Sequence, residues 1–178
     1  MDGSSDDTGD GNGGDATNGT DASTGAVDDD ERRKLETVRE YLEHLRETTP
    51  YYRWLDPDVL AVERGFVRIR QPYAERTEPP AVGPNEGING GVLVTLADAA
   101  GMAAVIADAL EPIPLATTDV TMSFHDGATE PHVVEAETIS VGSTLATARI
   151  EVVPESDLGT DDRRVLASGE TTARLFER

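Results

Sequence analysis

The chain has 178 residues and a formal net charge of −20 at pH 7, from 35 acidic and 15 basic side chains. Phosphate backbones and anionic membranes would be repelled by such a surface, so we expect no nucleic-acid partner and no membrane partner. There is no cysteine, which excludes disulfides, thiolate catalysis and cysteine-based metal sites. We accordingly expect no metal ion and no other cofactor.

Residues 1–30 consist almost entirely of Asp, Gly, Ser, Thr, Asn and Ala, with Val27 as the only large aliphatic residue. Such a segment has too little apolar surface to offset the entropy cost of ordering, so we expect a disordered acidic tail. It has neither the positive n-region nor the apolar h-region of a secretory signal, and we expect a cytoplasmic protein. Residues 31–178 are then expected to form one folded domain.

Lysine is nearly absent, because Lys34 is the only one and the other 14 basic residues are arginine. Residues 1–31 hold ten acidic side chains and no basic one, which leaves a net charge of −10 for the remainder. An acidic surface with so little lysine resembles those of proteins from salt-loving archaea. The alternative is an acidic chain from an organism with a high GC content.

The first half of the chain predicts a helix, two strands and a second helix. Apolar residues recur at helical spacing over residues 31–47, and Pro50 is expected to end that helix. Residues 59–71 predict two short strands that meet near Gly65. Residues 92–109 form the most apolar stretch, and their Ala and Leu content predicts a buried helix. We expect it to be too short and too interrupted by acidic residues to cross a bilayer.

The last third changes to the period of strands, over residues 117–124, 133–141, 146–152 and 165–175. In the first of these, Thr118 and Val120 alternate with Thr117 and Asp119, which predicts that the two pairs face opposite ways. The order predicts an α+β fold in which an antiparallel sheet wraps around one long central helix, with an N-terminal helix. Because the central helix is apolar on nearly every side, we expect a second copy of the chain to cover part of it. The expected assembly is a homodimer or a dimer of such dimers.

Asp98 stands among Ala and Gly in the middle of the predicted central helix. A carboxylate there is costly unless it is paired, hydrogen-bonded or facing a wet pocket, which makes it the best candidate for catalysis. The alternative is a structural Asp that binds a backbone group or the second subunit. Asn89, Gly90 and Gly91 precede the helix, where free N–H donors and the helix dipole favour a negative charge, as on the oxygen of an attacked carbonyl. The glycines could equally serve a purely conformational role.

Residues 85–98 read NEGINGGVLVTLAD. This run resembles the signature of the PaaI-type hotdog acyl-CoA thioesterases, which has an Asn and a Gly, then His-Gly-Gly, then an Asp nine residues after the His. Residues 50–55, 118–124 and 167–173 also resemble segments of that family. The resemblance covers residues 35–176 and implies a hotdog fold that hydrolyses acyl-CoA thioesters to free acid and coenzyme A.

By that resemblance, Asp98 would activate water, or attack directly, at the thioester carbonyl. The backbone N–H of Gly90 would polarise the carbonyl oxygen with help from Asn85, and Thr117 matches a position whose hydroxyl helps to hold the water. Coenzyme A would bind at the subunit boundary. The chain departs from the family at Asn89, which replaces the His and can hydrogen-bond but cannot titrate near neutral pH.

Two other functions are consistent with the same fold. A non-catalytic hotdog protein would bind acyl-CoA as a sensor or carrier, and a hotdog dehydratase would need an Asp/His pair for which no His is near the helix. The isolated His125 and His132 border turns and are expected to be surface residues rather than metal ligands. Arg163 and Arg164 are expected to belong to a solvated turn rather than to a phosphate site.

Overall fold

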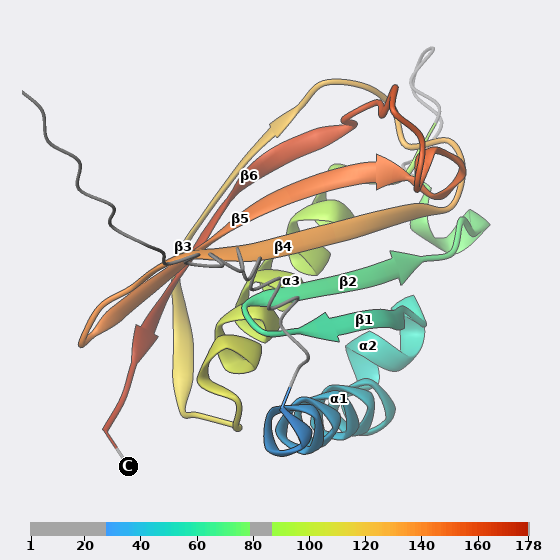
Figure 1. Ribbon diagram of the computed structural model, residues 1–178. Helices are drawn as coiled ribbons and strands as arrows, with labels where there is room; N and C mark the ends of the chain where they lie inside the picture. The colour runs from blue at the N-terminus through green and yellow to red at the C-terminus, as the bar shows by residue number, and fades with distance from the viewer. Residues whose placement is uncertain (1–27, 79–86, 178) are drawn as a thin grey trace, which may run out of the picture.

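A curved sheet of six antiparallel strands wraps around one long helix, α3 (Gly90–Ala109), in the computed structural model (Figure 1). The structure describes residues 28–78 and 87–177, so the expected tail lies almost wholly outside the described residues. The strand order is β1-β2-β4-β5-β6-β3. The strands are β1 (Asp58–Glu63), β2 (Phe66–Gln71), β3 (Leu115–Phe124), β4 (His132–Val141), β5 (Leu145–Pro154) and β6 (Ala167–Leu175).

Two helices precede the sheet, α1 (Asp29–Thr48) and α2 (Pro50–Leu55). Helix α1 packs against α2 and β1 and also reaches α3. The short turns η1 (Glu75–Thr77) and η2 (Glu155–Asp157) complete the elements. The predicted α+β hotdog architecture is confirmed, as is the turn at Gly65, whose φ of +69° favours glycine. Helix α2 was not among the elements predicted from the sequence. Pro50 ends α1 but also opens α2 at its first position, where the missing N–H of proline costs nothing.

Helix α3 forms the centre of the core. Its residues Leu93, Leu96, Ala100 and Ala104 are at most 2% exposed and face the sheet. With 20 residues, α3 is long and apolar enough to cross a membrane by length and composition, so the expectation that it is too short was wrong. Most of it is buried inside the domain, as in the core helix of a globular protein. Gly101 lets α3 lie close to β6, because a Cβ there would come within 2.7 Å of the Thr171 Cβ.

A bulge in β3 corrects the predicted alternation of that strand. Thr117 pairs with Ala173 and Asp119 pairs with Thr172, so Thr118 is an extra residue in the ladder. An extra residue reverses the facing of the side chains that precede it. Thr117 therefore lies on the helix side, with Met122, and not on the opposite face as simple alternation predicts.

His132 is fully buried, and the expectation that it lies on the surface was wrong. It begins β4 opposite Gln71 on the inner face, and neither imidazole nitrogen has a hydrogen bond of ordinary geometry within the described residues. Burial lowers the pKa of His132 from 6.5 to about 4, and the nearby backbone of Glu130 opposes this only in part. The folded protein therefore holds a neutral imidazole.

This buried imidazole predicts a loss of stability in mild acid. The pKa of His132 is lower in the folded protein than in the unfolded chain, so acid protonates the unfolded chain first and favours unfolding. The free energy of unfolding is therefore at its full value above pH 6.5 and decreases as the pH falls toward 4, by about 3 kcal/mol in total. Urea unfolding should be measured at pH 7 and at pH 4.5. Between these two values, the free energy of unfolding of His132→Gln should decrease by about 2 kcal/mol less than that of the wild type. Equal losses in the two proteins would show that His132 does not contribute.

Candidate active site

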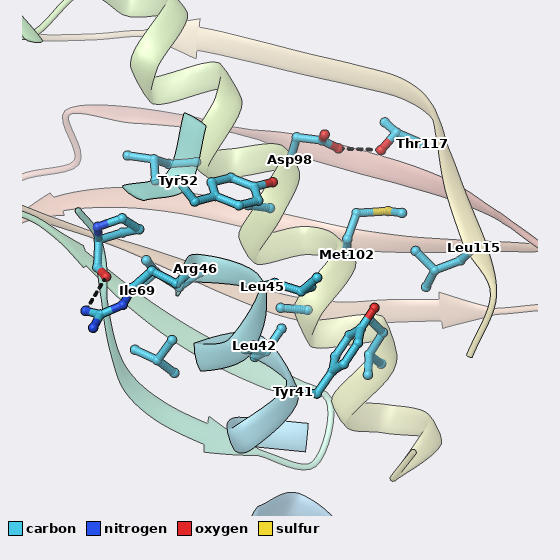
Figure 2. A pocket seen from close by; sticks show the side chains of 16 residues that line it. Tyr41, Leu42, Leu45, Arg46, Tyr52, Ile69, Asp98, Met102, Leu115 and Thr117 are labelled. Atoms are coloured by element: carbon cyan, nitrogen blue, oxygen red, sulfur yellow. Dashed lines mark hydrogen bonds between the residues drawn. The ribbon is translucent and has the colours of Figure 1, made fainter. Parts of the chain in front are cut away.

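Asp98 lies in the middle of α3, partly buried, and accepts a hydrogen bond from the Thr117 hydroxyl across a distance of 2.6 Å between Oγ1 and Oδ1 (Figure 2). The bulge in β3 is what turns Thr117 toward the helix. The other carboxylate oxygen, Oδ2, accepts no hydrogen bond from the part of the chain that the structure describes. Asp98 is thus oriented through one oxygen and open through the other.

The first turn of α3 leaves one donor free. Asn89 caps the helix, because its Oδ1 accepts the Gly91 N–H at 2.8 Å. The N–H groups of Val92 and Leu93 both donate to the Asn89 carbonyl oxygen. The N–H of Gly90 has no acceptor among residues 28–78 and 87–177. Asn89 therefore serves the helix start, and Gly90 is the position that can offer its N–H to a ligand.

Gly90 lies against an aromatic ring. A Cβ built at Gly90 would meet the Phe124 ring at 3.3 Å, and Phe124 is itself 52% exposed. The absence of a side chain at Gly90 thus keeps the helix start close to the end of β3. A ligand that reaches the Gly90 N–H would pass beside this exposed ring.

A cavity of about 250 Å³ opens beside Asp98, between α3, the N-terminal helices and the sheet (Figure 2). Its walls are mostly apolar, and Asp98 and Thr117 contribute polar groups to the lining. The apolar lining comes from Leu42, Leu45, Pro57, Val59, Ile69, Leu96, Ala99, Met102, Ala103, Ile106 and Leu115. Arg46 also lines it, but its guanidinium is held by the Pro57 carbonyl and the Asp58 carboxylate, each at 3.2 Å. The cavity suits an apolar group whose polar end stays near Asp98.

Tyr52 of α2 lines the same cavity, and its hydroxyl is directed toward Asp98 (Figure 2). Burial raises the pKa of Tyr52, and the charge of Asp98 raises it further, with a smaller contribution from Tyr51. The phenol therefore stays protonated at neutral pH. Tyr52 was not among the site residues predicted from the sequence. The concentration of aromatic residues over residues 50–55 was the signal that could have found it.

The structure brings together some of the expected site residues and separates others. Asp98 and Thr117 are in contact, whereas Gly90 and Asn89 lie two turns away, about 12 Å along the helix axis from Gly90 to Asp98. Asn85 lies outside the described residues. One chain therefore presents the carboxylate and the free N–H at two places along α3.

The other polar residues considered as ligand-binding groups pair with neighbouring side chains. Arg163 pairs with Glu135 and Glu151, and Arg164 pairs with Glu130 and Asp157, so neither guanidinium is free for a phosphate. His125 is exposed, as expected, and its Nε2 lies 2.8 Å from the Ser168 hydroxyl. Within the described ranges, no three His, Asp or Glu side chains gather closely enough to hold a metal ion.

Comparison with known proteins identifies the family. The family model described as "Thioesterase superfamily" matches residues 86–160, which include Gly90, Asp98 and Thr117. A protein of Halobacterium salinarum with the name "Putative esterase" is 34% identical over 115 residues, which cover 63% of this chain and 75% of that protein.

Solved structures share the fold. The E. coli PaaI protein from the phenylacetic acid degradation operon has a TM-score of 0.66 at 15% identity, covering 80% of this chain and 96% of its own. Zebrafish thioesterase superfamily member 2 has the same TM-score at 20% identity, covering 80% of this chain and 98% of its own. These two structures show that the chain has the hotdog fold. The 34% identical relative and the matching family model show that it belongs to the thioesterase superfamily.

Proposed function

We propose that the protein is a PaaI-type thioesterase that hydrolyses acyl-CoA to free acid and coenzyme A. The observation that carries this proposal is that Asp98 lines a mostly apolar cavity, with one oxygen held by Thr117 and the other open. An acyl chain would enter the cavity and leave its thioester carbonyl near the open oxygen. Membership of the thioesterase superfamily supports hydrolysis as the reaction.

The reaction follows from these groups. Asp98 takes a proton from a water molecule, whose oxygen forms a bond to the thioester carbon. The Gly90 N–H stabilises the negative charge that develops on the carbonyl oxygen. The carbon–sulfur bond then breaks, and the proton held by Asp98 passes to the departing thiolate or to solvent. The products are the carboxylic acid and coenzyme A, and no other reactant is needed.

A homodimer would complete the site. On α3, Gly91, Thr95, Asp98 and Met102 are not buried and share one side of the helix, and β3 pairs with β6 alone among the described strands. A strand of ten residues with one unpaired edge is a ready surface for pairing with another chain. We infer that a second copy covers this side of the molecule. Its α3 would then bring a Gly90 N–H to the Asp98 of the first chain.

Release of free thiol from a panel of acyl-CoAs tests the proposed function. The panel should contain short, medium and long alkyl chains and aryl acyl groups, assayed in molar potassium chloride. We expect thiol release that depends on enzyme concentration for at least one class. Tight binding of an acyl-CoA with no release of thiol would instead identify a non-catalytic sensor or carrier.

We propose in addition that the protein works in concentrated salt. Residues 32–178 carry a net charge of −10, and the excess acidic side chains repel one another. The 34% identical relative comes from Halobacterium salinarum. Salt screens this repulsion, since the Debye length falls from about 10 Å at 0.1 M to about 3 Å at 1 M. Thermal unfolding should therefore show a melting temperature clearly higher in 2 M than in 0.1 M potassium chloride. Equal melting temperatures would contradict adaptation to salt.

A further inference from the structure

Tyr52 carries a hydroxyl that the fold does not use. The side chain lines the cavity opposite α3, and its hydroxyl, directed toward Asp98, makes no hydrogen bond to any described residue (Figure 2). A phenol in a largely apolar wall loses hydration without gaining a partner, which is unfavourable unless a ligand or water completes the contact.

The backbone that carries Tyr52 is held in place from two sides. The fully buried Gln71 donates from Nε2 to the Leu55 carbonyl at 2.8 Å. Arg76 donates from Nε to the Trp54 carbonyl at 2.7 Å and from Nη2 to the Leu55 carbonyl at 3.2 Å. The last carbonyl groups of α2 are thus bound by side chains of β2 and η1. A six-residue helix fixed in this way presents its inward side chain in a defined place.

A water that attacks the thioester carbon beside Asp98 must be oriented through both of its protons. The Thr117 hydroxyl already donates its hydrogen bond to Asp98 Oδ1, so toward a water molecule it can act only as an acceptor. A water that donates one proton to Asp98 Oδ2 still has a second proton to place. Two hydroxyls that line the cavity near Asp98 can accept it: that of Thr117, which is already tied to the carboxylate, and that of Tyr52, which has no partner among the described residues. An acceptor that fixes this proton keeps a lone pair of the water directed at the carbonyl carbon.

We propose that the Tyr52 hydroxyl is a positioning residue that accepts the second proton of the attacking water as a hydrogen bond. The water then donates to Asp98 Oδ2 and to Tyr52 Oη, and a lone pair faces the thioester carbon. The bond changes are those of the hydrolysis proposed above, on which this inference rests, and Tyr52 neither gains nor loses a proton. Because its pKa is raised, Tyr52 stays neutral and places no second negative charge beside Asp98.

Tyr52→Phe tests this role, with Tyr51→Phe as the matched control. Tyr51 is the preceding residue, 45% exposed, and its ring stacks on Trp54 with centroids 6.0 Å apart, away from the cavity lining. Loss of one hydrogen bond should lower kcat for acyl-CoA hydrolysis about tenfold in Tyr52→Phe. KM should stay within about twofold, because the hydroxyl contacts water and not the acyl group. Tyr51→Phe should match the wild type in kcat, in KM and in melting temperature.

A reaction with added hydroxylamine distinguishes loss of water positioning in Tyr52→Phe from a general loss of catalytic activity. It is a stronger nucleophile whose attack does not require a water held between Asp98 and Tyr52. With hydroxylamine present, Tyr52→Phe should give a larger share of hydroxamate over free acid than the wild type does. Equal kcat in Tyr52→Phe and wild type would overturn the inference, and so would an equal fall of acid and hydroxamate. A wild type that hydrolyses no thioester would overturn the proposed function, and this inference with it.

Discussion

Replacing Asp98 by Asn is expected to lower thioester hydrolysis by about 10²–10⁴-fold, the usual contribution of a positioned general base. Asn has nearly the same size as Asp, and its Oδ1 can still accept the hydrogen bond from the Thr117 hydroxyl, so the contact at 2.6 Å can be kept. The amide cannot take a proton from water. The melting temperature should therefore change little, whereas kcat should fall by the factor given above.

Asp108→Asn is the matched control for this experiment. Asp108 lies on the same helix, is partly buried, and does not line the cavity beside Asp98. The same chemical change there should leave turnover close to that of the wild type. An Asp98→Asn protein that keeps more than half of the wild-type activity would remove Asp98 from the mechanism.

Mixing two inactive variants is expected to restore about a quarter of the wild-type activity. Gly90 and Asp98 are about 12 Å apart along α3, and one carboxylate arm does not span that distance to a shared carbonyl group. If each site joins Asp98 of one chain to Gly90 of its partner, Asp98→Asn and Gly90→Pro are both defective alone. Refolded together in equal amounts, about half of the dimers are mixed, and each mixed dimer has one intact site of two.

The structure accommodates Gly90→Pro at the backbone. Asn89 has ψ of 127°, in the extended range required before proline, and Gly90 is the first helical residue, where proline is tolerated. The added ring would contact the exposed Phe124 side chain, which can move. Gly90→Ala adds a similar contact but keeps the N–H, so it should retain much more activity than Gly90→Pro. Mixed dimers that form and yet regain no activity would contradict the shared site.

The elements of the fold could be predicted because their apolar spacing is regular, but the facing of some side chains could not. The bulge in β3 is defined by cross-strand pairing with β6, so strict alternation grouped Thr117 with Asp119, although Thr117 lies on the side of Met122. His132 was misplaced for a different reason. The inner-face pattern of Val134 and Ala136, extended one step back, reaches His132, so its burial was available in the sequence.

The candidate site was predictable only in part. The cost of burying a carboxylate in a helix of Ala and Gly marked Asp98, and the glycines at the helix start marked Gly90. The contact between Asp98 and Thr117 joins residues 19 apart, and only the resemblance to a family connected them beforehand. The aromatic residues over 50–55 mark the segment that holds Tyr52, but the role proposed for its hydroxyl depends on how Gln71 and Arg76 fix α2, which no local pattern records.

A single turnover in ¹⁸O-labelled water, with enzyme in excess over acyl-CoA, tests most directly whether Asp98 activates water that attacks the thioester carbonyl. We predict that the free acid formed in this first turnover carries one ¹⁸O atom, because the attacking oxygen comes from solvent. Unlabelled acid in the first turnover, with ¹⁸O subsequently found in the Asp98 carboxylate, would show that Asp98 attacks the carbonyl itself and would contradict the account.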